Sequence, residues 1–317
     1  MNVRPVTHRA GLRRDRRRRW FVFFFLAPTM ACFCLFYLYP ILTVFVTSFA
    51  KWDYRNVAAP EWYPLSEALT NYVYIFTRYP YFGEALGNSL GWSAVGLCVQ
   101  APLALISALT FSRRLPGWKL ARNAYIIPNV ISSAAIALIF LQLYNPRFGV
   151  VNPVIRLFSP GFSENILLME GVNFWAMTGA YVFFAGTSSI MILGHIMAVP
   201  EEVTEAAMLD GATGWKLDWL IIIPSIKPIL KTVCVLAATS GFLLYNEVYF
   251  LTKGAAGSKS LSYIIRDLAV MSSRTQFSRA NTVGVIQIVV GMLIILLING
   301  AFAIDRDALR HKRRRGA

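Results

Sequence analysis

Five long stretches of this chain contain no Asp, Glu, Lys or Arg, and this feature restricts its fold more than any other. The stretches are 20–50, 88–112, 123–146, 171–200 and 280–304. About 20 consecutive apolar residues are enough for a helix to cross a bilayer. A sixth stretch, 229–251, reaches this length with Lys231 and Glu247 near its ends, where charged side chains can reach the interface. The sequence therefore predicts an all-α integral membrane protein with six transmembrane helices.

The composition agrees with a chain that lies in a bilayer. Of its 317 residues, 56% are hydrophobic and 15% are charged. A soluble domain carries about 25% charged residues, so a soluble enzyme is the class that this composition disfavours most. No internal repeat or low-complexity linker divides the chain. We therefore predict one transmembrane domain over 20–304, flanked by basic cytoplasmic tails over 1–19 and 305–317.

The apolar pattern also places the spans within that domain. Their predicted bounds are 20–50, 88–112, 123–146, 171–198, 229–251 and 280–304, with a loop over 199–228 between the fourth and the fifth. The first stretch is too long for a secretory signal and lacks a small-residue cleavage site. We therefore expect it to be retained as a span.

The basic residues indicate which side each loop occupies. With both termini in the cytoplasm, 21 of the 31 Lys and Arg lie inside, 14 of them in the two tails. This distribution follows the positive-inside rule and predicts a multi-pass protein of the cytoplasmic membrane. The segment 247–279 runs against the rule, because it places five basic residues outside. Basic tails are typical of contact with anionic lipid and do not favour nucleic acid as a partner.

The loop over 199–228 has an unusual charge for a segment predicted to be cytoplasmic. Between 198 and 219, Lys216 accompanies five acidic residues, Glu201, Glu202, Glu205, Asp210 and Asp218. Pro200 suits the first helical position, acidic residues suit the first turn, and Gly211 suits a left-handed stop. The pattern predicts a helix of about three turns that ends at Gly211.

One face of this helix carries small side chains. Val203, Ala206 and Ala207 recur at spacings of three and four residues, which lets another backbone approach closely. Pro224 and Pro228 follow, and a proline inside a helix removes a hydrogen bond and bends the chain. The loop is thus predicted to contain a short docking helix that connects the fourth and the fifth span. Its acidic residues suit a basic partner.

Several motifs together resemble one protein family. Glu205-Ala206-Ala207, followed by Asp210-Gly211 and Pro224, resembles the EAA loop of binding-protein-dependent ABC importer permeases. Three further segments are similar to the maltose-type carbohydrate branch: Asn88-Ser89-Leu90, Leu143-Tyr144-Asn145 with Gly149 and Asn152, and Tyr249-Phe250-Leu251-Thr252-Lys253-Gly254. The chain departs from the branch at Ser89, where the family has Thr, and at 254–256, where Gly-Ala-Ala replaces Gly-Gly-Pro.

The resemblance implies an assembly and a mechanism. In that family the EAA helix is the coupling helix, which sits in a cleft of a separate cytoplasmic ATPase subunit. The implied ATPase-coupling residues are Glu205, Ala206, Ala207, Asp210, Gly211 and Pro224. The implied partners are a second permease subunit, two nucleotide-binding subunits that hold ATP and Mg, and an extracytoplasmic solute-binding protein. The implied cargo is a sugar or an oligosaccharide.

Catalytic and metal sites are not predicted for this chain. It has no Gly-x-x-x-x-Gly-Lys-Ser/Thr motif, so ATP hydrolysis is expected in a partner chain and no cofactor is expected in this one. Its three histidines do not form a nucleophile-base pair or a metal cluster, since two of them lie in the tails. The four cysteines fall in apolar runs, where we expect them to act as small hydrophobic residues.

Polar residues inside the apolar stretches are candidates for a substrate pathway. The predicted set is Thr187, Ser188, Ser240, Tyr245 and Asn246. An aromatic ring offers an apolar face for the C–H groups of a sugar, and an amide offers directional hydrogen bonds for its hydroxyls. The sequence leaves two interpretations of Glu247 open, because it either lines this pathway or marks the outer boundary of the membrane.

Two alternatives remain open at this point. An importer of another solute, such as a polyamine or a phosphate ester, shares the EAA loop. An ion-driven secondary transporter belongs to another class, and we expect it to carry charged residues in mid-span or broken helices at the bilayer centre. The five uncharged stretches argue against that class.

Overall fold

The computed structural model describes the backbone of residues 8–182 and 185–315, and the side chains of 20–182 and 185–303. The side chains of the two predicted basic tails lie outside the described residues. Almost all of the regular structure described is helical. The exception is an antiparallel hairpin of two short strands, β1 (Ala50–Lys51) and β2 (Glu61–Trp62).

Three helical segments are long and apolar enough to cross a membrane without a sharp bend. Trp20–Thr47 comprises the end of α1 (His8–Phe33), the π-helical η1 (Cys34–Leu38) and α2 (Tyr39–Thr47). Phe82–Ser112 comprises α4 (Phe82–Val95), the π-helical η3 (Gly96–Gln100) and α5 (Ala101–Ser112). Phe277–Ala303 belongs to α16 (Phe277–Arg315). These segments match the predicted spans 20–50, 88–112 and 280–304, although the second begins six residues earlier.

Three pairs of helices reach the length of a span only as bent units. The helices α6 (Trp118–Val130) and α7 (Ser133–Leu143) meet at 100°. The helices α9 (Val172–Val182) and α10 (Gly186–Ile196) flank positions 183–184, which lie outside the described residues. In the third pair, Trp215–Ser225 meets α14 (Lys227–Phe242) at 80°. By length and composition, the described part of the chain therefore holds three spans, or up to six if each bent pair counts as one.

The structure corrects the predicted course of two spans. The stretch 123–146 is not one helix, because the helix stops at Val130 and a new one starts at Ser133, with the Ser132 hydroxyl accepting from the Ala135 amide as an N-cap. The stretch 229–251 is also interrupted, because α14 ends at Phe242 and the chain is not helical at 243–245.

The remaining elements are short, and three of them make up the segment Trp215–Ser225 named above. They are the 3₁₀ helix η2 (Leu65–Glu67), α3 (Thr70–Thr77), α8 (Val151–Arg156), the 3₁₀ helix η4 (Ile166–Leu168), α11 (Glu201–Leu209), α12 (Trp215–Leu217), the π-helical η6 (Asp218–Ile222), α13 (Ile223–Ser225), the π-helical η7 (Val248–Thr252), α15 (Leu261–Arg266) and the π-helical η8 (Asp267–Met271).

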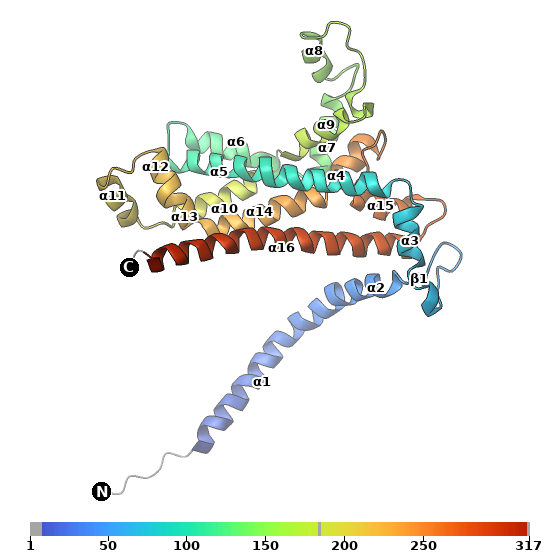
Figure 1. The fold of residues 1–317 in the computed structure, drawn as a ribbon, viewed down its shortest axis with the longest axis horizontal. Coiled ribbons are helices and arrows are strands. Elements are labelled where there is room, and N and C mark those ends of the chain that lie inside the picture. The colour runs from blue at the N-terminus through green and yellow to red at the C-terminus, as the bar shows by residue number, and fades with distance from the viewer. Residues whose placement is uncertain (1–7, 183–184, 316–317) are drawn as a thin grey trace.

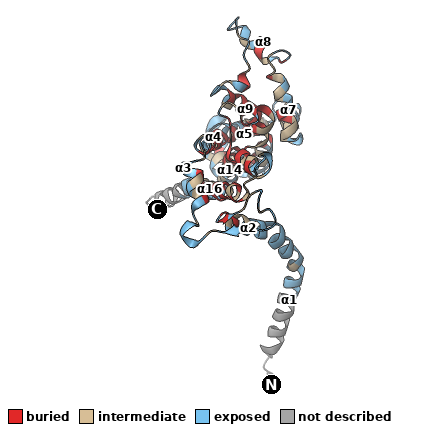
Figure 2. Cartoon of the chain, turned by 90° about the vertical axis from the view of Figure 1, so that its right-hand side faces the viewer, coloured by how far each residue is buried: buried red, intermediate tan, exposed pale blue. Residues whose placement is uncertain are grey.

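The long helices run side by side along the long axis of the molecule (Figure 1). The helix α14 contacts both α4 and α16, and α10 contacts α5. At one end lie α11, α12 and α13 together with the last turns of α16, and at the other end lie α3 and the hairpin (Figure 1). The first long segment diverges from this bundle, and its apolar side chains are exposed over most of its length (Figure 2).

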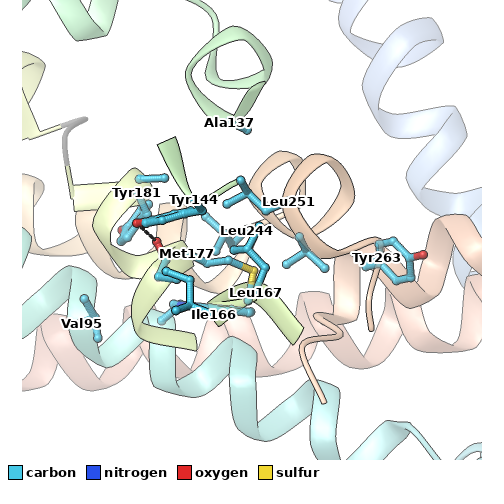
Figure 3. Close-up of a cluster of buried hydrophobic side chains, with 14 residues drawn as sticks. Val95, Ala137, Tyr144, Ile166, Leu167, Met177, Tyr181, Leu244, Leu251 and Tyr263 are labelled. Carbon is cyan, nitrogen blue, oxygen red and sulfur yellow. Dashed lines mark hydrogen bonds between the residues drawn. The ribbon is translucent and has the colours of Figure 1, made fainter. Parts of the chain in front are cut away.

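Buried side chains gather in three clusters along the bundle. The first, around Tyr144 and Met177, joins α7 and α9 to the chain that follows α14 (Figure 3). The second, around Ile192, lies between α5, α10 and α14. The third, around Phe242 and Ile264, joins α14 and α15 to α4 and α16. The two breaks in the predicted spans lie beside the first cluster.

Two glycines allow α14 to lie directly against the second long segment. A Cβ at Gly96 would collide with the carbonyl oxygen of Ala237, and a Cβ at Gly241 would collide with that of Trp92. Small residues let helix backbones approach in membrane proteins, where close packing rather than water exclusion drives helix association. The spacing of these glycines in the sequence did not reveal this contact, because they lie in different spans.

We expect Gly96→Ala to destabilise the protein by about 1–3 kcal/mol, since the added methyl group meets a backbone atom that cannot move aside. Gly87→Ala is the matched control, because a Cβ at Gly87 meets nothing within 4 Å. The control is expected to be neutral or slightly stabilising. Thermal unfolding of the purified protein in detergent measures both effects, and equal melting temperatures for the two variants would contradict the close contact.

Candidate functional site

A cavity of about 410 Å³ lies where the helices are interrupted. All five residues predicted for the pathway line it, namely Thr187, Ser188, Ser240, Tyr245 and Asn246. Three other polar residues of its lining, Gln100, Ser133 and Tyr181, were not predicted from the sequence, and Glu247, whose role was left open, also lines it. Thr187 and Ser240 are exposed, so the cavity is open at the surface of this chain.

The two described helix breaks meet at this cavity. The Asn246 amide follows the break at 243–245 and donates from Nδ2 to Ser133 Oγ, 2.5 Å away, at the start of α7. The break at 131–132 is therefore tied directly to the break in the predicted fifth span. In hydrocarbon, backbone that leaves the helix is tolerated where it is buried in protein or lines a polar cavity. The position of the cavity thus explains where the helices can stop.

A buried polar network forms the inner wall of the cavity. The Tyr181 hydroxyl lies 2.9 Å from Gln100 Oε1, from the Ala237 carbonyl oxygen and from Ser240 Oγ. Gln100 Nε2 donates in turn to the Tyr181 carbonyl oxygen at 3.5 Å. Because Tyr181 and Gln100 are almost fully buried, these bonds fix α9 against η3 and α14. Gln100 could have been found from the sequence, since it is the one long polar side chain within the uncharged stretch 88–112.

The remaining predicted residues have different surroundings. Thr187 is held by Asn129, whose Oδ1 accepts from its backbone amide at 3.2 Å and from its hydroxyl at 3.0 Å. Ser240 also donates to the Ala237 carbonyl oxygen of its own helix, at 3.0 Å. Glu247 is only 4% exposed and lines the cavity. Glu247 therefore lies in the same cavity as the five predicted pathway residues, as the first of its two interpretations requires.

An aromatic and cationic group flanks the cavity. Tyr245 and Tyr249 stack with their ring centroids 5.6 Å apart. The Arg266 guanidinium lies 5.3 Å from the Tyr245 ring centroid and 4.7 Å from that of Tyr249, and it donates a hydrogen bond to the Tyr245 hydroxyl. These contacts hold the Tyr245 ring in one orientation beside Asn246.

The predicted docking helix is α11, a nine-residue helix and so slightly shorter than expected. Pro200 precedes its first residue as the N-cap instead of occupying the first helical position. Gly211 has φ +84°, and the Ala212 amide donates to the Ala207 carbonyl oxygen at 2.9 Å. This is the left-handed stop that the sequence predicted.

The faces of α11 differ from the prediction at one residue. Glu205, Ala206 and Asp210 are exposed, whereas Ala207 is 8% exposed and packs against this chain itself. Of the two alanines on the small-residue face, Ala207 is therefore packed within this chain and Ala206 is accessible to a partner. Pro224 lies in α13, just before the bend of 80° that leads into α14.

An ion pair ties the segment after α11 to the second long segment. Arg113 Nη2, at the end of α5, lies 2.5 Å from Oδ2 of Asp218, which is 7% exposed. The pair lines a hollow of about 550 Å³ between α11 and the ends of α5 and α10. A charge contact between sequence positions 113 and 218 thus joins two walls of this hollow beside α11.

The other motif residues fix loops at the opposite end of the molecule. Asn88 Nδ2 donates to the carbonyl oxygens of Gly257 and Lys259, at 2.8 and 3.0 Å. Ser89 Oγ accepts from the Leu261 amide at 3.0 Å. Asn152 Nδ2 donates to the Glu164 carbonyl oxygen at 3.0 Å. Two of the three motifs are therefore structural, since their polar side chains each hold a loop that joins two helices.

Interrupted apolar helices that surround a polar cavity are typical of membrane transport proteins. Comparison with known proteins agrees with this class. Residues 100–310 match the family described as "Binding-protein-dependent transport system inner membrane component". The chain belongs to this family and is an integral membrane protein.

Individual relatives are distant but cover most of the chain. The arabinooligosaccharides transport system permease protein AraP of Bacillus subtilis is 27% identical over 288 residues, which cover 88% of each protein. A chain of a bacterial ABC transporter involved in the import of the acidic polysaccharide alginate superposes with a TM-score of 0.77 at 21% identity, covering 92% of this chain and 98% of that one. A second structure, of the alginate transporter in complex with an alginate pentasaccharide-bound periplasmic protein, gives 0.73 at 21% identity, with 90% and 95% covered.

Family membership also decides between the two transporter classes considered from the sequence. Broken helices were expected of an ion-driven secondary transporter, yet they occur in this member of a binding-protein-dependent family. The presence of helix breaks is therefore not a criterion that separates the two classes. Both have to admit a polar solute into hydrocarbon, and both can use non-helical backbone around the site.

The Arg113–Asp218 pair predicts non-additive effects on stability. Arg113→Gln and Asp218→Asn should each lower the melting temperature. The double variant should lose less unfolding free energy than the two single variants lose together, with a coupling energy of about 0.5–3 kcal/mol. Arg114→Gln, at the exposed neighbouring position, is the control and is expected to be neutral. A thermal double-mutant cycle measures the coupling, and strict additivity would show that the pair contributes nothing.

Proposed function

We propose that this chain is the permease subunit that translocates a sugar or an oligosaccharide in an ATP-driven importer. In this proposal it crosses the cytoplasmic membrane six times with both termini in the cytoplasm. The observation that carries the proposal is the cavity at the helix breaks. Its lining combines an aromatic ring at Tyr245, an amide at Asn246 and hydroxyls at Thr187, Ser188 and Ser240. That combination suits the apolar and hydroxyl faces of a sugar.

The relatives support a saccharide as the cargo. AraP is named for arabinooligosaccharides, and the two superposed structures are of an alginate importer. A cavity of about 410 Å³ that opens at the surface of this chain can hold a sugar unit while more of the ligand extends beyond it. We propose that the second permease subunit closes the open side.

The topology is supported by three features. Three continuous segments and three bent pairs amount to six spans when each bent pair is counted as one. The last turns of α16 lie at the same end of the bundle as α11, as Figure 1 shows. Because the chain carries 14 basic residues in its tails, this end is proposed to be cytoplasmic. We also propose a single domain over 20–304, which the contacts between these spans support.

The proposed role of α11 is to couple ATP hydrolysis to the cavity. In this proposal Glu205, Ala206 and Asp210, which are exposed, contact the ATPase, while the buried Ala207 fixes the helix to the permease. Gly211 ends α11, and the chain continues through Pro224 and the 80° bend into α14. Since α14 ends at the cavity, we propose that a displacement of α11 moves α14 and so changes the shape of the cavity. This would be a rigid-body change of the domain-closure kind.

The proposal requires partners that supply energy and substrate. Two nucleotide-binding subunits would bind ATP and Mg, since this chain carries no phosphate-binding loop, and an extracytoplasmic solute-binding protein would deliver the sugar. The family is described as binding-protein-dependent, and one structural neighbour was solved with such a periplasmic protein.

Reconstitution tests the proposal as a whole. The complex is purified with its binding protein, the sugar that raises the melting temperature of that protein is identified, and ATP-dependent uptake of the sugar into proteoliposomes is measured. We expect uptake that requires all of the subunits. Stabilisation of the binding protein by a polyamine or a phosphate ester, with no response to any sugar, would overturn the choice of cargo.

Asn246→Leu is expected to reduce sugar uptake at least ten-fold, because a side chain of similar volume removes an amide that bonds substrate hydroxyls, and such a loss costs about 1–3 kcal/mol. Ser133→Ala is the matched variant, because it removes the hydroxyl that Asn246 contacts and leaves the amide in place. Initial uptake rates in proteoliposomes measure both. Equal losses in the two variants would mean that Asn246 only joins the helix breaks.

Glu205→Lys is expected to reduce uptake and the co-purification of the ATPase at least ten-fold, because a like charge at a docking surface is repelled by a basic partner. Insertion of the chain into the membrane should not change. Glu170→Lys is the control, since it makes the same change of charge at another exposed position. Normal uptake by the Glu205 variant would contradict the coupling role of α11.

A further inference from the structure

A second hollow, of about 390 Å³, lies at the end of the molecule opposite to α11. Its walls come from the chain that follows the first long segment and from the chain that leads into α16. Four basic residues line it, Lys51, Arg55, Arg274 and Arg279, together with one acidic residue, Asp53. We refer to this hollow as the basic pocket. The cavity at the helix breaks lies elsewhere and shares no lining residue with the basic pocket.

Backbone and buried side chains give the basic pocket a fixed shape. The Ser278 amide donates to the Trp52 carbonyl oxygen at 3.1 Å, and the Tyr54 amide donates to the Thr275 carbonyl oxygen at 2.9 Å. Asn71, which is 2% exposed, donates from Nδ2 to the carbonyl oxygens of Ser48 and Ala50 at 2.9 and 2.8 Å. The two walls are therefore joined to each other, although they lie more than 200 residues apart in the sequence.

The positive charge of the basic pocket is not neutralised within the described residues. Arg55 is paired with Asp53 at 2.7 Å, and by donating hydrogen bonds to this carboxylate it lowers the pKa of Asp53. Lys51 is paired with Glu61, outside the pocket, at 3.4 Å. Among the described residues, that leaves Arg274 and Arg279, on the other wall, without an acidic partner.

These two arginines differ in how they are held. The Arg279 guanidinium lies 3.5 Å from the Tyr74 ring centroid and donates to Gln276 Oε1 at 2.5 Å, so its position is fixed. The Arg274 side chain is exposed and makes no hydrogen bond or ion pair to the part of the chain that the structure describes. The pocket thus presents one fixed and one free guanidinium to an anion.

The position of the pocket along the chain sets its depth in the membrane. The first apolar segment ends at Thr47 and the last begins at Phe277, so Lys51, Arg274 and Arg279 all lie within a few residues of a span end. This is the level of the lipid headgroups, which extend about 5–7 Å beyond the hydrocarbon on each side. Beside the pocket, Trp62 and Val57 are more than half exposed, as expected of side chains at a membrane interface.

We propose that the basic pocket binds the headgroup of an anionic phospholipid from the leaflet opposite to α11. In this arrangement the phosphate accepts hydrogen bonds from Arg274 and Arg279, and the acyl chains lie along the exposed apolar side chains at the end of α2, such as Val46. The site also accounts for the excess of basic residues in 247–279, because two of the five residues that oppose the positive-inside rule belong to it.

Native mass spectrometry of the purified complex in a non-ionic detergent tests the proposal, with dioleoylphosphatidylglycerol and dioleoylphosphatidylcholine as probes. We expect the wild type to retain phosphatidylglycerol more tightly than phosphatidylcholine. One neutralised cation near a headgroup should weaken the tightest phosphatidylglycerol site about five-fold, so Arg274→Gln should weaken it about five-fold and the Arg274→Gln, Arg279→Gln double variant about 25-fold. The basic tails are the same in every variant and contribute equally.

Arg78→Gln is the matched control, because Arg78 is exposed near the same end and does not line the pocket. It should leave the affinity unchanged. The single Arg274 variant keeps the test decisive if loss of the Tyr74 contact in the double variant disturbs folding. Unchanged phosphatidylglycerol affinity in Arg274→Gln, or equal retention of the two lipids by the wild type, would overturn the proposal. If Arg274→Gln instead weakened docking of the binding protein in pure phosphatidylcholine nanodiscs, the pocket would be assigned to an acidic protein surface.

Discussion

Hydrocarbon offers the peptide backbone no hydrogen-bond partner, and the structure of this protein follows from that restriction. A chain in lipid has to remain helical unless protein or an enclosed polar space satisfies its amides and carbonyls. Here the interruptions at 131–132 and 243–245 meet, joined through Asn246 and Ser133, beside the buried group around Tyr181. The place where the helices stop and the place where a polar solute can be accommodated are therefore the same place.

Local properties of the sequence predicted much of this arrangement. Apolar length is enough to locate spans, and proline and glycine at positions 200 and 211 are enough to delimit α11, because each acts on the chain within a few residues. The five residues predicted for the pathway all line one cavity, and they stood out because polar side chains are uncommon within apolar membrane-spanning stretches.

What the sequence did not predict depends on contacts between distant segments. The early end of α14 at Phe242 reflects the attachment of the following residues to α7, and the importance of Gly96 and Gly241 is visible only when the opposing backbones are in place. The inward face of Ala207 likewise depends on neighbouring parts of the bundle. The residue periodicity of one helix does not predict any of these three features, since each depends on a contact with a distant segment of the chain.

The attachment of α14 along its length has a mechanical consequence. Gly96 and Gly241 lock its backbone to the second long segment, while the 80° bend at Ile226 and the non-helical residues 243–245 bound it at its two ends. A force applied at one end of α14 therefore acts on a helix that is held along its middle and interrupted at both ends. Because regular helical hydrogen bonding stops at Ile226 and at 243–245, we expect any change of angle to occur at these two points rather than within α14.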